Sequence, residues 1–120
     1  MNPEVRDEWV RRLRSGDYPQ GGGQLRSPLG RFCCLGVLCE LAGAVGVATY
    51  DPVEGGYRSV ESPDEDPYTG QLPPAVVRWA GLTSPDPVVA GRSLSTWNDG
   101  TMSTARRTFA DIATMIEEEL

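Results

Sequence analysis

Apolar residues recur at helical spacing near the start of the chain. Within residues 3–14 they share one face of a helix while charged residues occupy the others, and the apolar set is Val5, Trp9, Val10 and Leu13. Asn2 followed by Pro3 is a favourable helix start, because Asn accepts hydrogen bonds from free N–H groups and proline suits the first helical position. The pattern predicts an amphipathic helix from Pro3 to Arg14, which Trp9 anchors to the core.

A second stretch is apolar on almost every side and contains all three cysteines, Cys33, Cys34 and Cys39. Its spacing predicts a buried central helix from position 33 to 41 or 44. An apolar run of this length also forms strands, so helix and strand both stay open for residues 32–40. Gly36 costs a helix roughly 1 kcal/mol relative to alanine, which indicates that another backbone passes close to it.

The rest of the first two thirds of the chain is rich in glycine, proline and tyrosine, which indicates short strands and turns. Residues 16–31 are expected to form a loop and a hairpin. Residues 47–50 and 56–60 predict a β-hairpin, with a further strand left open at 68–72. The triple glycine at 21–23 is able to present backbone N–H groups to an anion, but it lacks the Lys-Ser/Thr ending of a phosphate loop, so we favour a flexible connector.

Towards the C-terminus, short elements precede one amphipathic helix. A short helix is predicted over residues 73–82 and a brief strand at 87–89, and Asn98-Asp99-Gly100 predicts a turn. Ser103 or Thr104 is expected to cap a helix that runs through Glu119. The whole pattern predicts a single α+β domain over residues 1–120, in which short antiparallel β-hairpins pack against about four helices around the cysteine helix.

The cysteines offer little catalytic or metal chemistry. The chain has no His, so neither a Cys–His nucleophile pair nor a zinc site built from cysteine and histidine pairs is available. We therefore expect the thiols to pack as small hydrophobic side chains, and we expect no metal or cofactor. The alternative is a small enzyme that uses Cys33 or Cys34 as its nucleophile.

Composition restricts the partners. Eleven basic residues, all Arg, stand against 17 acidic ones, which gives a net charge of −6. A protein that coats a nucleic-acid backbone needs a positive surface, so nucleic acid is not the expected partner. The N-terminus is unlike a signal peptide and no apolar run approaches the roughly 20 residues of a membrane span, so we expect a cytoplasmic protein with no membrane association.

Several short motifs spread along the chain together carry a resemblance to a known family. They are Trp9-x-x-x-Leu13-x-Ser15-Gly16-x-Tyr18-x-Gln20, Phe32-Cys33-Cys34-Leu35-Gly36-Val37-Leu38-Cys39, Trp79-Ala80-Gly81-Leu82, Asn98-Asp99 and Phe109-Ala110-Asp111-Ile112-Ala113. In these the chain resembles a family of small uncharacterised proteins carried by tailed bacteriophages and prophages. The resemblance implies a protein of the host bacterial cytoplasm, and small accessory phage proteins of this kind are often binders that blunt host defence.

The expected function is therefore non-catalytic binding in phage–host conflict, either of a nucleotide-type signal or of a host protein. For a nucleotide-like ligand, arginines would bind phosphate, aromatic rings would stack, and polar side chains would read edges. The residues expected to bind phosphate are Arg26, Arg31, Arg92 and Arg106. Those expected to stack on the base are Tyr18 and Trp97, and those expected to hydrogen-bond its polar edges are Gln20, Asn98 and Asp99. Arg106 and Arg107, placed at the start of the last predicted helix, form the strongest expected anion site.

Two other possibilities remain. Residues 108–113 are similar to the first helix of a helix-turn-helix, which would make the protein a phage transcriptional regulator, although no recognition helix follows. Self-association into a homo-oligomer also stays open.

Overall fold

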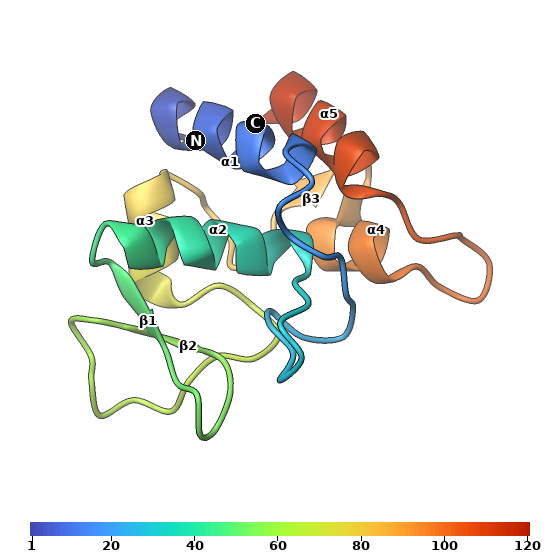
Figure 1. Ribbon diagram of the computed structural model, residues 1–120. Coiled ribbons are helices and arrows are strands. Elements are labelled where there is room, and N and C mark those ends of the chain that lie inside the picture. Colours follow the sequence, from blue (N-terminus) through green and yellow to red (C-terminus); the bar gives the residue numbers. More distant parts are fainter.

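The computed structural model describes residues 1–120, which form a single α+β domain with five helices and two small antiparallel sheets, as predicted. The helices are α1 (Pro3–Arg14), α2 (Cys34–Ala44), α3 (Pro74–Ala80), α4 (Leu94–Asp99) and α5 (Phe109–Glu119). The strands are β1 (Ala48–Tyr50) paired with β2 (Tyr57–Ser59), and β3 (Val88–Val89) paired with β4 (Arg92–Ser93). Helices α1 and α5 lie side by side above α2, and the β1–β2 hairpin lies below it (Figure 1).

Helix α2 lies at the centre of the fold. Of the two alternatives left open for this segment, the helix is therefore correct and the strand is not. Eight of its residues are buried, including Cys34 and Cys39. A Cβ atom added at Gly36 would lie 1.8 Å from the carbonyl oxygen of Leu25, so the predicted close approach of another backbone is confirmed. The chain at Leu25 reaches this position only because residue 36 has no side chain.

Helix α1 has the predicted bounds and start. Asn2 Oδ1 accepts hydrogen bonds from the backbone N–H groups of Glu4 and Val5 at 2.9 and 3.3 Å. Trp9 is fully buried, and its Nε1 donates to the Cys34 carbonyl oxygen at 2.9 Å. That hydrogen bond fixes α1 across the first turn of α2 while the indole fills the core.

The predicted β-hairpin is confirmed, with Ala48 opposite Ser59 and Tyr50 opposite Tyr57. The further strand considered at 68–72 is reduced to one bridge between Tyr57 and Tyr68. It goes no further because the Leu72 N–H donates to the Pro85 carbonyl oxygen instead of to the hairpin.

Two predictions near the C-terminus are wrong. Asn98 and Asp99 lie in the last turn of α4 rather than in a turn, and α5 begins at Phe109, with Thr108 rather than Ser103 or Thr104 as its cap. The reason is tertiary, since the N–H of Arg107 donates to the Trp97 carbonyl oxygen at 2.8 Å and so ties the chain before α5 to the end of α4. No helix combines the length and apolar character needed to cross a membrane.

Candidate functional site

Asn98 brings together several of the residues singled out in the sequence. It is fully buried, and its Oδ1 accepts hydrogen bonds from the Cys34 N–H at 3.1 Å and from Gln20 Nε2 at 3.0 Å. Its Nδ2 donates to the Gly21 carbonyl oxygen at 2.8 Å and to Asp99 Oδ1 at 2.9 Å. The carboxamide of Asn98 is therefore fully used within the chain. It holds the triple glycine against α4 instead of reading the edge of a ligand.

Gln20 has a similar positioning role. Besides Asn98, its Nε2 donates to the Arg107 carbonyl oxygen at 2.8 Å. Gln20 thus joins the segment before the triple glycine to the segment before α5. Asp99 differs from these two because its side chain is exposed beside Gly22, where a Cβ atom would lie 3.0 Å from Asp99 Oδ1.

Arg106 lies in this network, two residues before Thr108, the N-cap of α5, and not in the first turn of that helix as expected. Its Nε donates to the Asn98 carbonyl oxygen at 3.2 Å and its Nη2 to the Gly21 carbonyl oxygen at 2.9 Å. A guanidinium carries five N–H donors, so these two bonds leave donors available. Arg106 fixes the triple-glycine loop and still presents positive charge at the surface.

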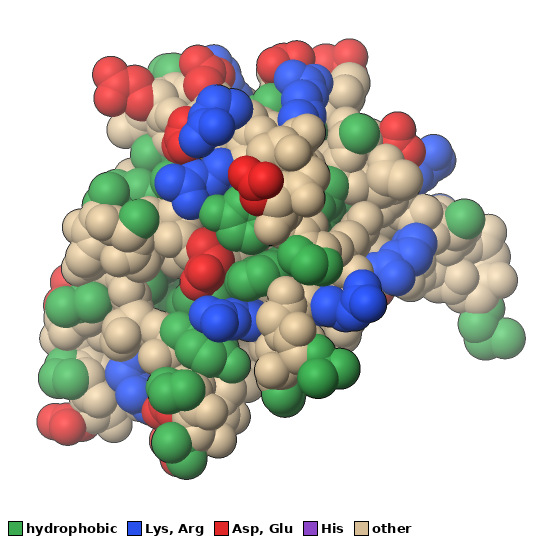
Figure 2. All heavy atoms as spheres, in the orientation of Figure 1, with side chains coloured by type: hydrophobic (Ala, Val, Ile, Leu, Met, Phe, Trp, Pro, Cys, Tyr) green, Lys and Arg blue, Asp and Glu red, His purple; other side chains and the backbone are tan.

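Most arginines of this chain are neutralised by a carboxylate. Seven of the eleven lie within ion-pairing distance of one: Arg6, Arg11, Arg12, Arg14, Arg26, Arg58 and Arg78. The other four are exposed, and we call them the arginine cluster: Arg31, Arg92, Arg106 and Arg107. Blue side chains follow one another across the face shown in Figure 2 towards the projecting loop.

The cluster gathers around α4 and the triple glycine. Arg92 and Arg107 approach the ring of Trp97, with their guanidinium carbons 5.3 and 5.5 Å from its centroid. A Cβ atom at Gly21 would lie 2.8 Å from the Cβ of Arg31, which places Arg31 directly beside the residue whose carbonyl oxygen binds Arg106. Positive charge is thereby concentrated on one part of an otherwise acidic protein.

Backbone donors lie next to this charge. The N–H of Gly21 donates to the Phe32 carbonyl oxygen, but those of Gly22, Gly23 and Gln24 have no hydrogen-bond partner within the chain. Arg106 Nη2 would be 3.5 Å from a Cβ atom at Gly22, so the free N–H groups begin beside a guanidinium. Successive free N–H groups are a recurrent feature of anion-binding concavities.

The two expected stacking residues have different environments. Trp97 is 9% exposed and its Nε1 donates to the Val89 carbonyl oxygen at 2.8 Å, so its ring belongs to the core and a stacking role is not supported. Tyr18 is half-buried, with its hydroxyl accepting from Arg12 Nη1 at 2.7 Å and its ring edge-on to Phe32 at 5.4 Å. Tyr18 therefore supports the loop rather than presenting a free face.

Arg26 lies apart from the arginine cluster. Its guanidinium carbon is 4.1 Å from the ring centroid of Tyr50, and its Nη1 lies 3.6 Å from Glu40 Oε2. The same Glu40 oxygen accepts a hydrogen bond from the Tyr57 hydroxyl at 2.6 Å. Arg26 thus joins the loop before α2 to the β1–β2 hairpin. No local pattern in the sequence indicates this arrangement, because the partners of Arg26 lie far away along the chain.

All three cysteines are free and buried, as expected. Burial raises the pKa of Cys33 to about 11, and it raises the pKa values of Cys34 and Cys39 well above the usual range for a thiol. At neutral pH the thiols are therefore protonated, the form that is neither nucleophile nor metal ligand. No three Cys, Asp or Glu side chains lie close enough together to hold a metal ion.

The fold and this site define a small α+β protein with an acidic overall charge and one basic surface built around a glycine loop. The chain belongs to the DUF8296 family, described as a domain of unknown function, whose family model matches residues 1–120. No curated protein matches the chain. No solved structure matches it either.

Proposed function

We propose that this protein is a non-catalytic binding protein that holds a small phosphate-bearing ligand of the nucleotide type on the arginine cluster. The observation that carries the proposal is that four exposed arginines have no carboxylate partner and lie close to free backbone N–H groups. Arg31 and Arg106 lie beside the glycine loop, and Arg92 and Arg107 lie against Trp97 of α4. Guanidinium groups and backbone N–H groups are the donors that bind phosphate best, because their hydrogen bonds are assisted by charge.

The charge of the chain favours a small ligand over a polymer. A net charge of −6 repels an extended nucleic-acid backbone, whereas a cluster of four arginines attracts one or a few phosphates. The buried, protonated thiols support a role in binding rather than catalysis.

The resemblance to phage proteins supplies the biological setting of the proposal. In the cytoplasm of an infected bacterium, a protein that sequesters a nucleotide signal blunts any defence that depends on that signal. Sequestration needs affinity and an adequate amount of protein, and it needs no chemical step.

Native mass spectrometry of the protein taken from expressing bacterial lysate, repeated after denaturation, tests retention of a ligand. A mass excess of several hundred daltons, of about the size of a nucleotide, that disappears on denaturation is expected. Calorimetric titration of the purified protein with nucleotides and pyrophosphate then measures affinity directly. A bare chain mass together with no binding of any of these probes would contradict the proposal.

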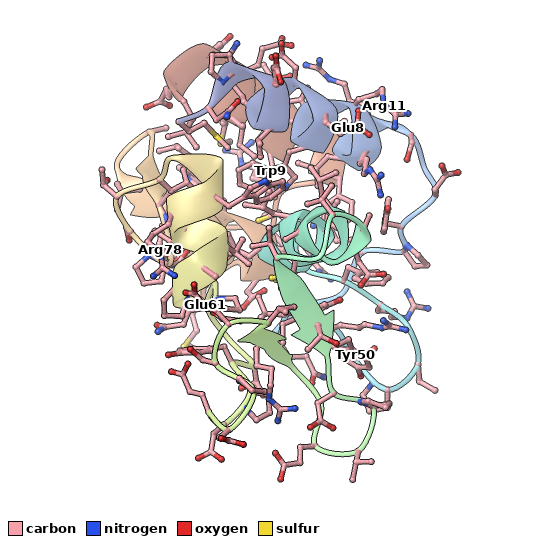
Figure 3. All side chains as sticks on the ribbon, turned by 90° about the vertical axis from the view of Figure 1, so that its left-hand side faces the viewer. Glu8, Trp9, Arg11, Tyr50, Glu61 and Arg78 are labelled. Carbon is pink, nitrogen blue, oxygen red and sulfur yellow. The ribbon has the colours of Figure 1, made fainter.

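The variants Arg31→Gln and Arg107→Gln locate the site, because both side chains are exposed and neither has a carboxylate partner to lose. Each is expected to weaken binding by about tenfold or more, because a hydrogen bond to a charged group contributes about 1.5–3 kcal/mol. The matched control is Arg78→Gln. Arg78 is an exposed arginine on α3, outside the cluster, and it forms an ion pair with Glu61 (Figure 3). Equal affinity of all three variants would show that the ligand binds elsewhere.

A host protein is the second candidate partner, and one feature favours it. The loop before α5 projects from the body of the molecule (Figure 1), and Met102 within it is fully exposed. Methionine is enriched in protein–protein interfaces and depleted on free surfaces. Affinity capture from host lysate should recover a partner with the native chain and lose it with Met102→Ser. Capture that is unchanged by this substitution would remove the loop from the interface.

A further inference from the structure

A hollow lies between the loop before α2 and the turn of the β1–β2 hairpin, and no arginine of the arginine cluster lines it. Its volume is about 340 Å³, within the range of about 300–1,000 Å³ typical of small-molecule sites. We call it the Tyr50 hollow, after the residue that points towards that loop from the end of β1 (Figure 3). The residues used in the argument are Gln24, Arg26, Pro28, Tyr50, Val53 and Glu54, all of which line it.

The walls combine apolar surface with hydrogen-bonding groups of both kinds. Pro28 and Val53 supply apolar area, and Val53 is 91% exposed. The Tyr50 hydroxyl and the Gln24 carboxamide have no hydrogen-bond partner within the chain, so both are available to a ligand. A carboxylate only accepts hydrogen bonds, so Glu54 selects a ligand edge that carries N–H donors.

The floor of the hollow is held in place by its neighbours. Arg26 is positioned by Glu40 at 3.6 Å and by the ring of Tyr50 at 4.1 Å. Tyr50 in turn packs against Tyr57, with ring centroids 5.2 Å apart. A site whose walls are fixed before binding loses less entropy when the ligand arrives.

The hollow adjoins the arginine cluster through the glycine loop. Gly22 lies beside Arg106, and Gln24, the second residue after it, lines the hollow. The Cα atoms of Gly22 and Gln24 are therefore at most about 7 Å apart. A nucleotide places its base and its phosphate on opposite sides of one sugar, which matches the proximity of an anion-binding surface to a mixed apolar and polar hollow.

We propose that the Tyr50 hollow is the base subsite for the ligand whose phosphate lies on the arginine cluster. This inference rests on the proposed function and adds its specificity. The flat faces of the base lie against Pro28 and Val53, and its edge is read by Gln24, Tyr50 and Glu54. Because Glu54 accepts only, a guanine, with adjacent N–H donors on its edge, is preferred over an adenine.

Calorimetry with guanosine diphosphate, adenosine diphosphate and pyrophosphate tests the base subsite. The native protein is expected to bind guanosine diphosphate most tightly and pyrophosphate most weakly. The double variant Gln24→Ala/Glu54→Gln should lose about tenfold or more in affinity for guanosine diphosphate and keep its affinity for pyrophosphate. The change at Gln24 removes a hydrogen bond, and the change at Glu54 removes the negative charge and replaces one of two accepting oxygens by a donor. Tyr50→Phe, which removes only the hydroxyl, should act in the same direction.

The controls separate this inference from the proposed function. Gln71→Ala removes an exposed glutamine elsewhere and should leave all three affinities unchanged. Arg31→Gln should weaken all three probes together. If both nucleotides bind no more tightly than pyrophosphate, or if the double variant binds guanosine diphosphate like the native chain, the base subsite is overturned while phosphate binding stands. If none of the three probes binds, both proposals fall.

Discussion

The side chain of Asn98 caps helix α2 from 64 residues further along the chain, through the hydrogen bond between its Oδ1 and the backbone N–H of Cys34 at 3.1 Å. The residue before the helix, Cys33, makes no side-chain capping hydrogen bond, so Asn98 supplies the cap that the local sequence lacks. The same carboxamide holds Gly21. The central helix and the glycine loop of the candidate site therefore depend on one buried side chain.

Asn98→Ala is expected to lower the free energy of unfolding by about 3 kcal/mol, because it leaves several buried polar groups unpaired at about 1–3 kcal/mol each. Urea denaturation measures this. The matched control is Asn2→Ala, which removes the exposed cap of α1 and should cost about 1 kcal/mol. Equal effects of the two substitutions would show that the Asn98 network contributes little beyond a helix cap.

Gly36→Ala should destabilise the protein by about 2 kcal/mol or more, since the new Cβ would lie 1.8 Å from the Leu25 carbonyl oxygen and force α2 and the loop apart. Gly43→Ala in the same helix is the control, because its nearest neighbour would be 3.7 Å away. That substitution should stabilise the protein by about 0.5–1 kcal/mol through helix propensity. Thermal or urea unfolding of the pair distinguishes close packing from propensity, and a stabilising effect at both positions would contradict the contact.

The stability of the protein should decrease as the pH rises from about 9 to about 11. Burial raises the pKa of Cys33 from 9.0 to about 11, so the unfolded chain loses this proton first and folding stability falls across that interval. Cys34, Cys39 and Tyr57 act in the same direction, because burial also raises their pKa values. Urea midpoints measured across this pH range should decline less steeply for Cys33→Ala. An equal decline in the variant would assign the effect to the other groups.

Glu8 should titrate well below an ordinary glutamate. Hydrogen bonds from Arg11 and Arg12 lower the pKa of its carboxyl from 4.5 to about 2 (Figure 3). The contribution of this lowered pKa to folding stability is fully present above about pH 4.5 and is lost as the pH falls towards 2. A carbon-detected NMR titration of the Glu8 carboxyl measures the pKa directly, and Arg12→Gln should raise it. Because the pair is partly exposed, added salt should also raise it. A pKa near 4.5 in the native chain would contradict the interaction.

Much of the helical structure follows from the sequence. In α1, the spacing of Val5 and Trp9 and the Asn2 cap are local features, and a helix forms from interactions between residues three or four apart. In α2, an apolar run of this length is compatible with a helix or a strand, so both stayed open. Gly36 correctly indicated the close approach of another backbone. Local periodicity and caps were sufficient for these elements because their causes lie within one or two helical turns.

The start of α5 and the composition of the candidate site were decided by tertiary contacts. Ser103, Thr104 and Thr108 are all acceptable caps by residue type, and the hydrogen bond from the Arg107 N–H to Trp97 selects Thr108. The sequence likewise shows eleven arginines but not which of them meet a carboxylate, since a pair such as Arg14 and Glu117 is formed between residues 103 apart. By itself the sequence determined the amphipathic helices, the buried cysteines and the acidic charge. The tertiary structure alone decided which arginines stay unpaired, because ion pairing depends on distances in space that the chain order does not encode locally.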